Sequence, residues 1–150
     1  MARRSDTPIR EANSATDSEF DRSVWMRLAA LVPDYARRSV ERLPRDVQAY
    51  FVTRLFEWET KNGGTDAFLR AAPELIDLVA PAYRHLGLIS VAESFTRFEA
   101  AEPTQRLLAD PSRPLSDPEV ATLRRLFREI GTHDVERIAF VRANPDVFSF

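Results

Sequence analysis

The fold is decided at the stretch Trp58-Glu59-Thr60-Lys61-Asn62-Gly63-Gly64-Thr65-Asp66-Ala67-Phe68, which separates two segments of helical period. The chain has only four glycines, and two of them are adjacent here. Because glycine adopts left-handed backbone conformations without steric cost, the run Asn62-Gly63-Gly64 predicts the end of a helix. Thr65 offers a hydroxyl cap for the next helix, and Asp66 would lie in its first turn. We therefore expect a tight corner between two helices.

Apolar residues on both sides of this corner recur at the three-four spacing of an amphipathic helix. Gly87 marks a second helix stop of the same kind. The spacing predicts helices over residues 17–32, 34–43, 47–61, 66–71, 73–86, 88–101, 117–130 and 134–144, with an irregular connection over 102–115. No segment shows the alternation typical of a strand. The sequence predicts a compact all-α domain of about seven or eight helices.

The domain is expected to span residues 17–150, preceded by a disordered N-terminal tail. Residues 1–16 are polar and lack a hydrophobic period, which is typical of a flexible segment. Thr16 followed by Glu19 matches a capping box, so the first helix is predicted to begin there.

Composition excludes several functional classes. No run approaches the roughly 18 consecutive apolar residues of a membrane span, and the chain has no cysteine, so we expect a cytoplasmic protein. The formal net charge is −2, and residues 46–150 carry 12 basic against 16 acidic residues. This acidic balance argues against direct nucleic-acid binding.

The sequence contains none of the motifs of the common classes of catalytic site. His85 and His133 are each isolated from a partner at metal-binding spacing, so no metal site is predicted. The Gly63-Gly64 pair lacks the lysine of a phosphate-binding loop. We expect no catalytic residues and no cofactor. An enzyme of unrecognised type, with one of the two histidines as base, stays a third alternative.

Carboxylates flank the corner and form the candidate partner-binding group. They are Glu57, Glu59, Asp66, Glu74 and Asp77. A surface that imitates duplex DNA must match about one negative charge per 1.7 Å of helix axis, which only a local acidic patch of this chain could approach. The alternative is that these are ordinary surface carboxylates. In the same way, Arg124, Arg125 and Arg128 form a basic face that we interpret as solvated.

The order of these motifs resembles the bacterial DNA-mimic-protein-like domain family. The resemblance covers about residues 40–150 and rests on three elements: the Trp58-Glu59 pair leading into Asn62-Gly63-Gly64, the later Gly87, and the run Asn144-Pro145-Asp146-Val147-Phe148. It implies an all-α fold, often dimeric, without a known catalytic centre. The family takes its name from a member whose acidic surface occupies a DNA-binding regulator. This chain departs from the pattern at Thr65, where family members often have phenylalanine.

The leading hypothesis is a non-enzymatic protein-interaction or regulatory module. In its concrete form, the acidic residues around the corner bind a DNA-binding protein. The alternative is an inhibitor or immunity-type partner of a toxin or enzyme, which would bind through an apolar surface. The two differ in salt dependence, because only the first contact rests on screened charge.

Overall fold

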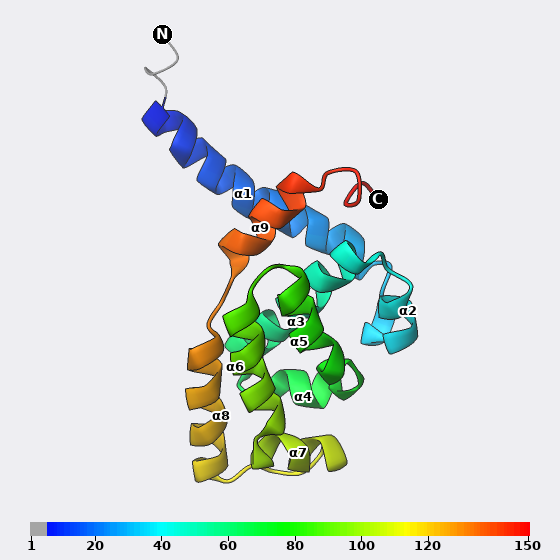
Figure 1. The fold of residues 1–150 in the computed structure, drawn as a ribbon, viewed down its shortest axis with the longest axis vertical. Helices are drawn as coiled ribbons and strands as arrows, with labels where there is room; N and C mark the ends of the chain where they lie inside the picture. Colours follow the sequence, from blue (N-terminus) through cyan, green and yellow to red (C-terminus); the bar gives the residue numbers. More distant parts are fainter. Residues whose placement is uncertain (1–5) are drawn as a thin grey trace.

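The computed structural model describes the backbone of residues 6–150 and the side chains of residues 17–150. This part of the chain contains nine α-helices and two short 3₁₀ turns but no strand (Figure 1). The helices are α1 (Asp6–Ala29), α2 (Arg37–Glu41), α3 (Arg45–Gly63), α4 (Ala67–Ala71), α5 (Ile76–His85), α6 (Ile89–Ala100), α7 (Glu102–Ala109), α8 (Asp117–Ile130) and α9 (Asp134–Ala143). The 3₁₀ turns are Pro33–Tyr35 and Pro73–Leu75. The predicted all-α fold is confirmed, with one helix more than the upper number expected.

Helix α3 forms the centre of the core, because side chains on most of its sides are buried. From Ala49 to Glu57, every position except Arg54 is buried. Helix α5 packs against α3, α6 packs against α5, and α8 packs against α6 (Figure 1). Phe56 lies edge-on to four other rings at centroid distances of 4.9–5.7 Å; they are Phe68 of α4, Phe95 and Phe98 of α6, and Phe127 of α8. This aromatic group joins three helices, α4, α6 and α8, to α3.

Helices α1 and α9 pack together on another side of α3. Arg142 of α9 forms an ion pair with Asp17 of α1, and its guanidinium lies 4.4 Å from the ring centroid of Phe20. Figure 1 shows α9 crossing over α1. Phe148, which follows α9, is buried against Tyr50 of α3. The α1–α9 pair therefore covers the part of α3 that α5 leaves open.

The corner after α3 differs in detail from the prediction. Helix α3 continues through Gly63, and only Gly64 has a left-handed φ, of 101°. Gly63 is still helical, and a Cβ there would lie 2.8 Å from the Cβ of Ala67, so the close approach of α4 is what requires glycine at this position. The expected cap by Thr65 is wrong, because Thr65 is buried and Asp66 occupies the N-cap position of α4. Gly87 has a φ of 82° directly after α5.

Two other expectations about the elements are corrected. Helix α7 occupies residues that were predicted to be irregular, because Pro103 lies in the first turn, where the missing N–H costs nothing. Helix α1 begins at Asp6, so the start expected at Thr16 is wrong. Of the predicted tail, residues 1–5 lie outside the described residues, and the flexibility of residues 1–16 stays a prediction. Helix α8 begins with a capping box between Ser116 and Glu119.

Candidate functional site

The acidic residues predicted to bind a partner occupy different environments. Glu57 is only 3% exposed, so its prediction as a surface carboxylate is wrong. The error arises because α3 is buried on most of its sides, whereas the three-four spacing of its apolar residues predicts burial on one side only. Trp58, one of the apolar residues at that spacing, is 54% exposed instead. The remaining four acidic residues are all at least partly exposed.

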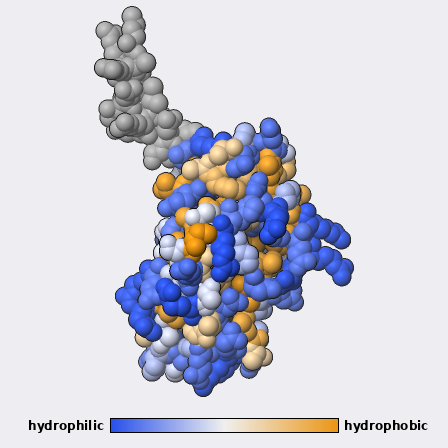
Figure 2. Space-filling model, viewed as in Figure 1, coloured by the Kyte–Doolittle hydropathy of each residue, from blue (hydrophilic) through white to orange (hydrophobic). Residues whose placement is uncertain are grey.

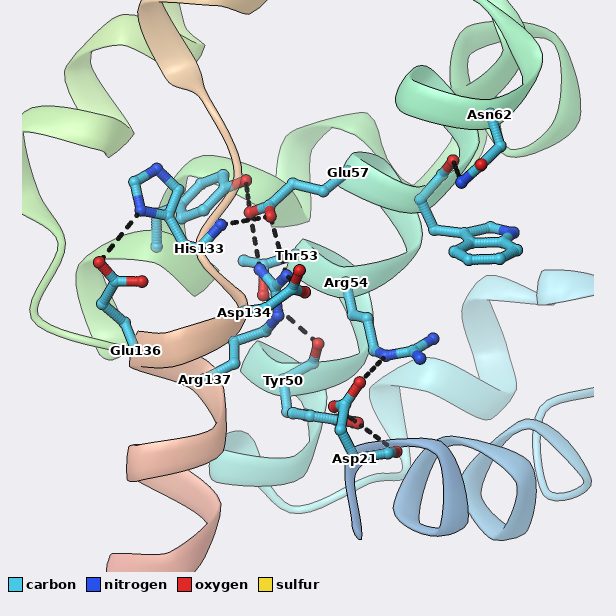
Figure 3. A network of polar contacts seen from close by, with 12 residues as sticks. Asp21, Tyr50, Thr53, Arg54, Glu57, Asn62, His133, Asp134, Glu136 and Arg137 are labelled. Atoms are coloured by element: carbon cyan, nitrogen blue, oxygen red, sulfur yellow. Dashed lines mark hydrogen bonds and ion pairs between the residues drawn. The ribbon is translucent and has the colours of Figure 1, made fainter. Parts of the chain in front are cut away.

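Glu57 is the centre of a buried polar network (Figure 3). Its carboxylate accepts two hydrogen bonds from the Arg137 guanidinium, at 2.6 and 2.8 Å. It accepts two more, at 2.6 Å from the Tyr83 hydroxyl and at 2.7 Å from the backbone N–H of His133. Four donors thus satisfy one buried carboxylate, and they come from α5, α9 and the α8–α9 connection. Glu57 therefore holds three parts of the fold to α3 and is not available to a partner.

Arg137 completes this network and remains charged in it. Burial acts to lower the pKa of Arg137, but its hydrogen bonds and charge interaction with Glu57 raise that pKa above the usual value. A third hydrogen bond, of 2.9 Å, joins Arg137 to Asp134. The same burial, followed by the negative charge of Glu57, raises the pKa of the Tyr83 hydroxyl well above 10. Both donors therefore keep their protons across the physiological pH range.

A second arginine gathers carboxylates at the surface. Arg37 of α2 contacts Asp77 of α5 at 2.5 and 3.0 Å and also forms an ion pair with Glu41. It donates a further hydrogen bond of 2.7 Å to the backbone carbonyl of Glu74. Partial burial, and then the negative charge of Asp77, raise the pKa of Glu99 on α6. We call Arg37, Glu41, Glu74, Asp77 and Glu99 the Arg37 cluster. The guanidinium pairs with the carboxylates of Asp77 and Glu41, Glu74 contributes its backbone carbonyl, and Glu99 is affected by the charge of Asp77.

The other two predicted acids lie on either side of the corner. Glu59 lies beside the Tyr35 hydroxyl, whose pKa is raised by burial and then by the charge of Glu59. Asp66 is bound at 2.5 Å by Arg70, which also donates to the backbone carbonyls of Pro111 and Arg113. The Asp66 charge is thus offset inside a structural contact. The structure joins Glu74 and Asp77 through Arg37, places Glu59 near the segment that leads into α2, and ties Asp66 to a loop.

The two histidines take part in structural contacts. His85 lies 2.5 Å from Asp46, which joins the end of α5 to the start of α3. The ring of His133 lies 2.7 Å from the carbonyl oxygen of Ile130. Among residues 17–150, no three His, Asp or Glu side chains are grouped in a way that could hold a metal ion. Within residues 6–150, none of the helices has the length and apolarity that a membrane crossing requires.

The model of the DMP19-like protein family matches residues 41–144, more than half of the chain. The chain belongs to the DMP19-like protein family. The matched region runs from the end of α2 to the end of α9 and includes Glu57, Arg137 and most of the Arg37 cluster. The resemblance found in the sequence is therefore confirmed at the level of the family. Neither the curated proteins nor the solved structures compared with the chain gave a match.

Sequence reasoning missed Arg137 and Glu99 as members of these two groups. Arg137 lies 80 residues from Glu57, and nothing in the spacing of α9 distinguishes it from a surface arginine. The sequence gives a weak indication that Glu99 lies near Asp77, because the turn at Gly87 folds α6 back along α5. The last residues of α6 must then lie near the first residues of α5, where Asp77 is found.

Proposed function

We propose that the chain is a non-enzymatic protein-interaction module that binds a basic partner protein through the Arg37 cluster. Membership of a family named for a DNA-mimic protein supports an interaction role. On this proposal the partner is a protein that otherwise binds DNA.

The crowding of carboxylates around Arg37 carries the proposal. The cluster has four carboxylates and one guanidinium, which pairs with Asp77 and Glu41. Glu74 and Glu99 form no ion pair among the described residues, so the cluster carries an excess of negative charge. Burial, and after it the negative charge of Asp77, raise the pKa of Glu99, and the second of these causes supports a local excess of negative charge. An arginine-rich or lysine-rich partner would supply the missing counter-charge. Glu59, beside Tyr35, would extend the same surface toward α3.

The apolar-surface alternative has less support. Large exposed apolar side chains are few, and they come from different elements: Met26, Leu31, Trp58, Ile89, Val135 and Phe150. On the face shown in Figure 2, hydrophilic side chains surround several separate apolar groups. An inhibitor that binds through an apolar interface would need a continuous patch.

The test is affinity capture from a lysate of the source cells, eluted in rising salt, with the bound proteins identified by mass spectrometry. The bait is the unmodified chain or the variant Glu74→Gln/Asp77→Asn/Glu99→Gln. A matched control, Glu19→Gln/Asp117→Asn/Asp146→Asn, removes the same charge from exposed residues outside the cluster. We expect a DNA-binding protein that is released at moderate salt and displaced by added duplex DNA.

The cluster variant should lose this protein, and the control should retain it. Capture that is equal for both variants, or that persists at high salt, would remove the Arg37 cluster as the binding surface. The apolar-interface alternative would then be favoured.

A further inference from the structure

A hollow of about 290 Å³ opens between α1, α3 and α9, on the outer side of the buried network. Its wall on α3 includes Arg54, Trp58 and Lys61, and its wall on α9 includes Asp134 and Arg137. The size is close to the lower end of the range for small-molecule sites. The Arg37 cluster contributes none of the lining residues, so the hollow is separate from the proposed partner surface.

Hydrogen-bond donors outnumber free acceptors in the hollow. Glu57 already accepts four hydrogen bonds, and Asp21 accepts from Tyr50 and from Arg54 Nε. Among the described residues, both terminal nitrogens of Arg54 lack a hydrogen-bond acceptor, and Lys61 forms no ion pair. Such a surplus of cationic donors is satisfied by an anion.

A buried donor without a partner lies at the same place. Arg137 is 1% exposed, and its Nε–H has no hydrogen-bond partner among the described residues. Asp134 at the rim is 62% exposed and accepts from Arg137, the same guanidinium that pairs with Glu57. The charged lining residues are three acids and three bases, and Lys61 is the cation that has no ion-pair partner among the described residues.

The α3 wall also offers an aromatic surface. Arg54, Trp58 and Lys61 are separated by four and three residues, which places them on one face of the helix. Trp58 lies between the two cations, and its 54% exposure leaves indole surface open to solvent. The Arg54 guanidinium is 6.0 Å from the Trp58 ring centroid and 4.5 Å from that of Trp25, so Arg54 is held beside the indole. A planar ring can pack on Trp58 while an attached anionic group reaches Lys61.

We propose that this hollow binds a small molecule with a planar aromatic ring and one anionic group. Lys61 pairs with the anionic group, Trp58 packs on the ring, and Arg54 supplies further hydrogen bonds. The shared chemistry includes aromatic carboxylates and aromatic phosphate esters.

The test uses phenylacetate and phenyl phosphate as the two anionic probes. Benzyl alcohol is the control with a ring but no charge, and acetate is the control with a charge but no ring. Isothermal titration calorimetry on the unmodified chain measures binding. In the variant Trp25→Phe, Trp58 is the only tryptophan, so its fluorescence reports directly on the hollow.

We expect at least one anionic probe to saturate below about 10 mM, the weak affinity typical of ligands this small, and both controls to bind at least tenfold more weakly. Binding of one probe only would identify the anionic group that the hollow prefers. Lys61→Met, which keeps the apolar stem, should weaken binding about tenfold. Arg124→Met, the matched loss of an exposed charge on α8, should leave it unchanged. Trp58→Ala should abolish binding in calorimetry, whereas Ile89→Ala, at another exposed apolar residue, should not.

The proposal is overturned by any of three results. No heat and no change in Trp58 fluorescence with either probe would exclude the site. Equal binding of benzyl alcohol or acetate would exclude the combined chemistry. Unchanged affinity in Lys61→Met, with a folded protein by circular dichroism, would exclude the assigned role of the cation.

Discussion

Arg137 and Arg37 both bind carboxylates, but Arg137 is buried and Arg37 lies at the surface. Each guanidinium is bound by two carboxylates, Arg137 by Glu57 and Asp134 and Arg37 by Asp77 and Glu41. The Arg137 side chain is 1% exposed, whereas the Arg37 side chain is 36% exposed. In the core, both carboxylate oxygens of Glu57 accept hydrogen bonds that hold other parts of the fold to α3. At the surface, the Arg37 cluster contains further carboxylates that form no ion pair among the described residues. Burial thus distinguishes a structural ion pair from the surface that we propose binds a partner.

The largest effect should follow from breaking the buried pair. Glu57→Gln leaves the buried Arg137 charge with only the exposed Asp134 as a counter-charge, and we expect a loss of about 3–5 kcal/mol in the free energy of unfolding, measured by urea denaturation. The double variant Glu57→Leu/Arg137→Met removes both charges and should recover most of the loss. If Glu57→Gln cost less than about 1 kcal/mol, the two arginine sites would not differ in the way proposed.

Tyr83→Phe removes one of the four donors to Glu57 and should cost about 1.5–3 kcal/mol, the range for a hydrogen bond to a charged group. The cost should depend on pH. Because the pKa of Tyr83 is raised in the folded protein, the unfolded chain loses this proton first, near pH 10. The stabilisation is therefore complete below pH 10 and decreases as pH rises further. A difference between Tyr83→Phe and the unmodified protein that stays constant from pH 8 to pH 12 would contradict the assignment.

Glu119 tests a carboxylate between these extremes, because it is hydrogen-bonded but near solvent. The backbone N–H of Ser116, and next Arg113, lower the pKa of Glu119 to about 2. A lowered folded pKa gives stability that is present above the ordinary value of 4.5 and lost as pH falls toward 2. Glu119→Gln should therefore lower Tm at pH 7 but have little effect near pH 2. A Tm difference that does not change with pH would show that the carboxylate charge is not involved.

The smallest change in stability should come from the surface arginine. Arg37→Gln removes ion pairs that are partly exposed, so we expect a cost below about 1 kcal/mol. The same change removes the only cation of the Arg37 cluster and should strengthen binding of a basic probe such as a short oligoarginine peptide, measured by titration at low salt. Arg38→Gln, an exposed neighbour without an ion pair among the described residues, serves as the control for net charge. An equal gain in probe binding by Arg37→Gln and Arg38→Gln would show that the effect depends only on the overall charge of the protein.

Most of the fold could be predicted because apolar spacing reports burial on one side of a helix. The spacing of Leu123, Leu126 and Ile130 identified α8, and these residues are buried. The same reasoning failed for α3, where Glu57 was assigned to the surface and Trp58 to the core. The apolar runs Tyr50-Phe51-Val52 and Leu55-Phe56 are the signal that was missed, since they indicate a helix covered on most sides.

The candidate site was less predictable, because it depends on contacts between residues far apart in the chain. Asp77 was named from its position after the corner, but its role comes from Arg37, 40 residues earlier. Glu99 joins the cluster only through the packing of α6 on α5. A single sequence gives the charge of each side chain, but the distances among charges follow from the packing of helices.

The link between Glu57 and Arg137 also bears on the order of folding. Contacts between α3, α4 and α5 close short loops, whereas this ion pair joins residues 80 positions apart. Loop-closure entropy favours early formation of the central helices, so α9 is expected to dock after the rate-limiting step. Disruption of the Arg137 contact should then speed unfolding much more than it slows folding. Arg137 would then lengthen the lifetime of the folded state by slowing unfolding, and α9 would be the first helix to detach.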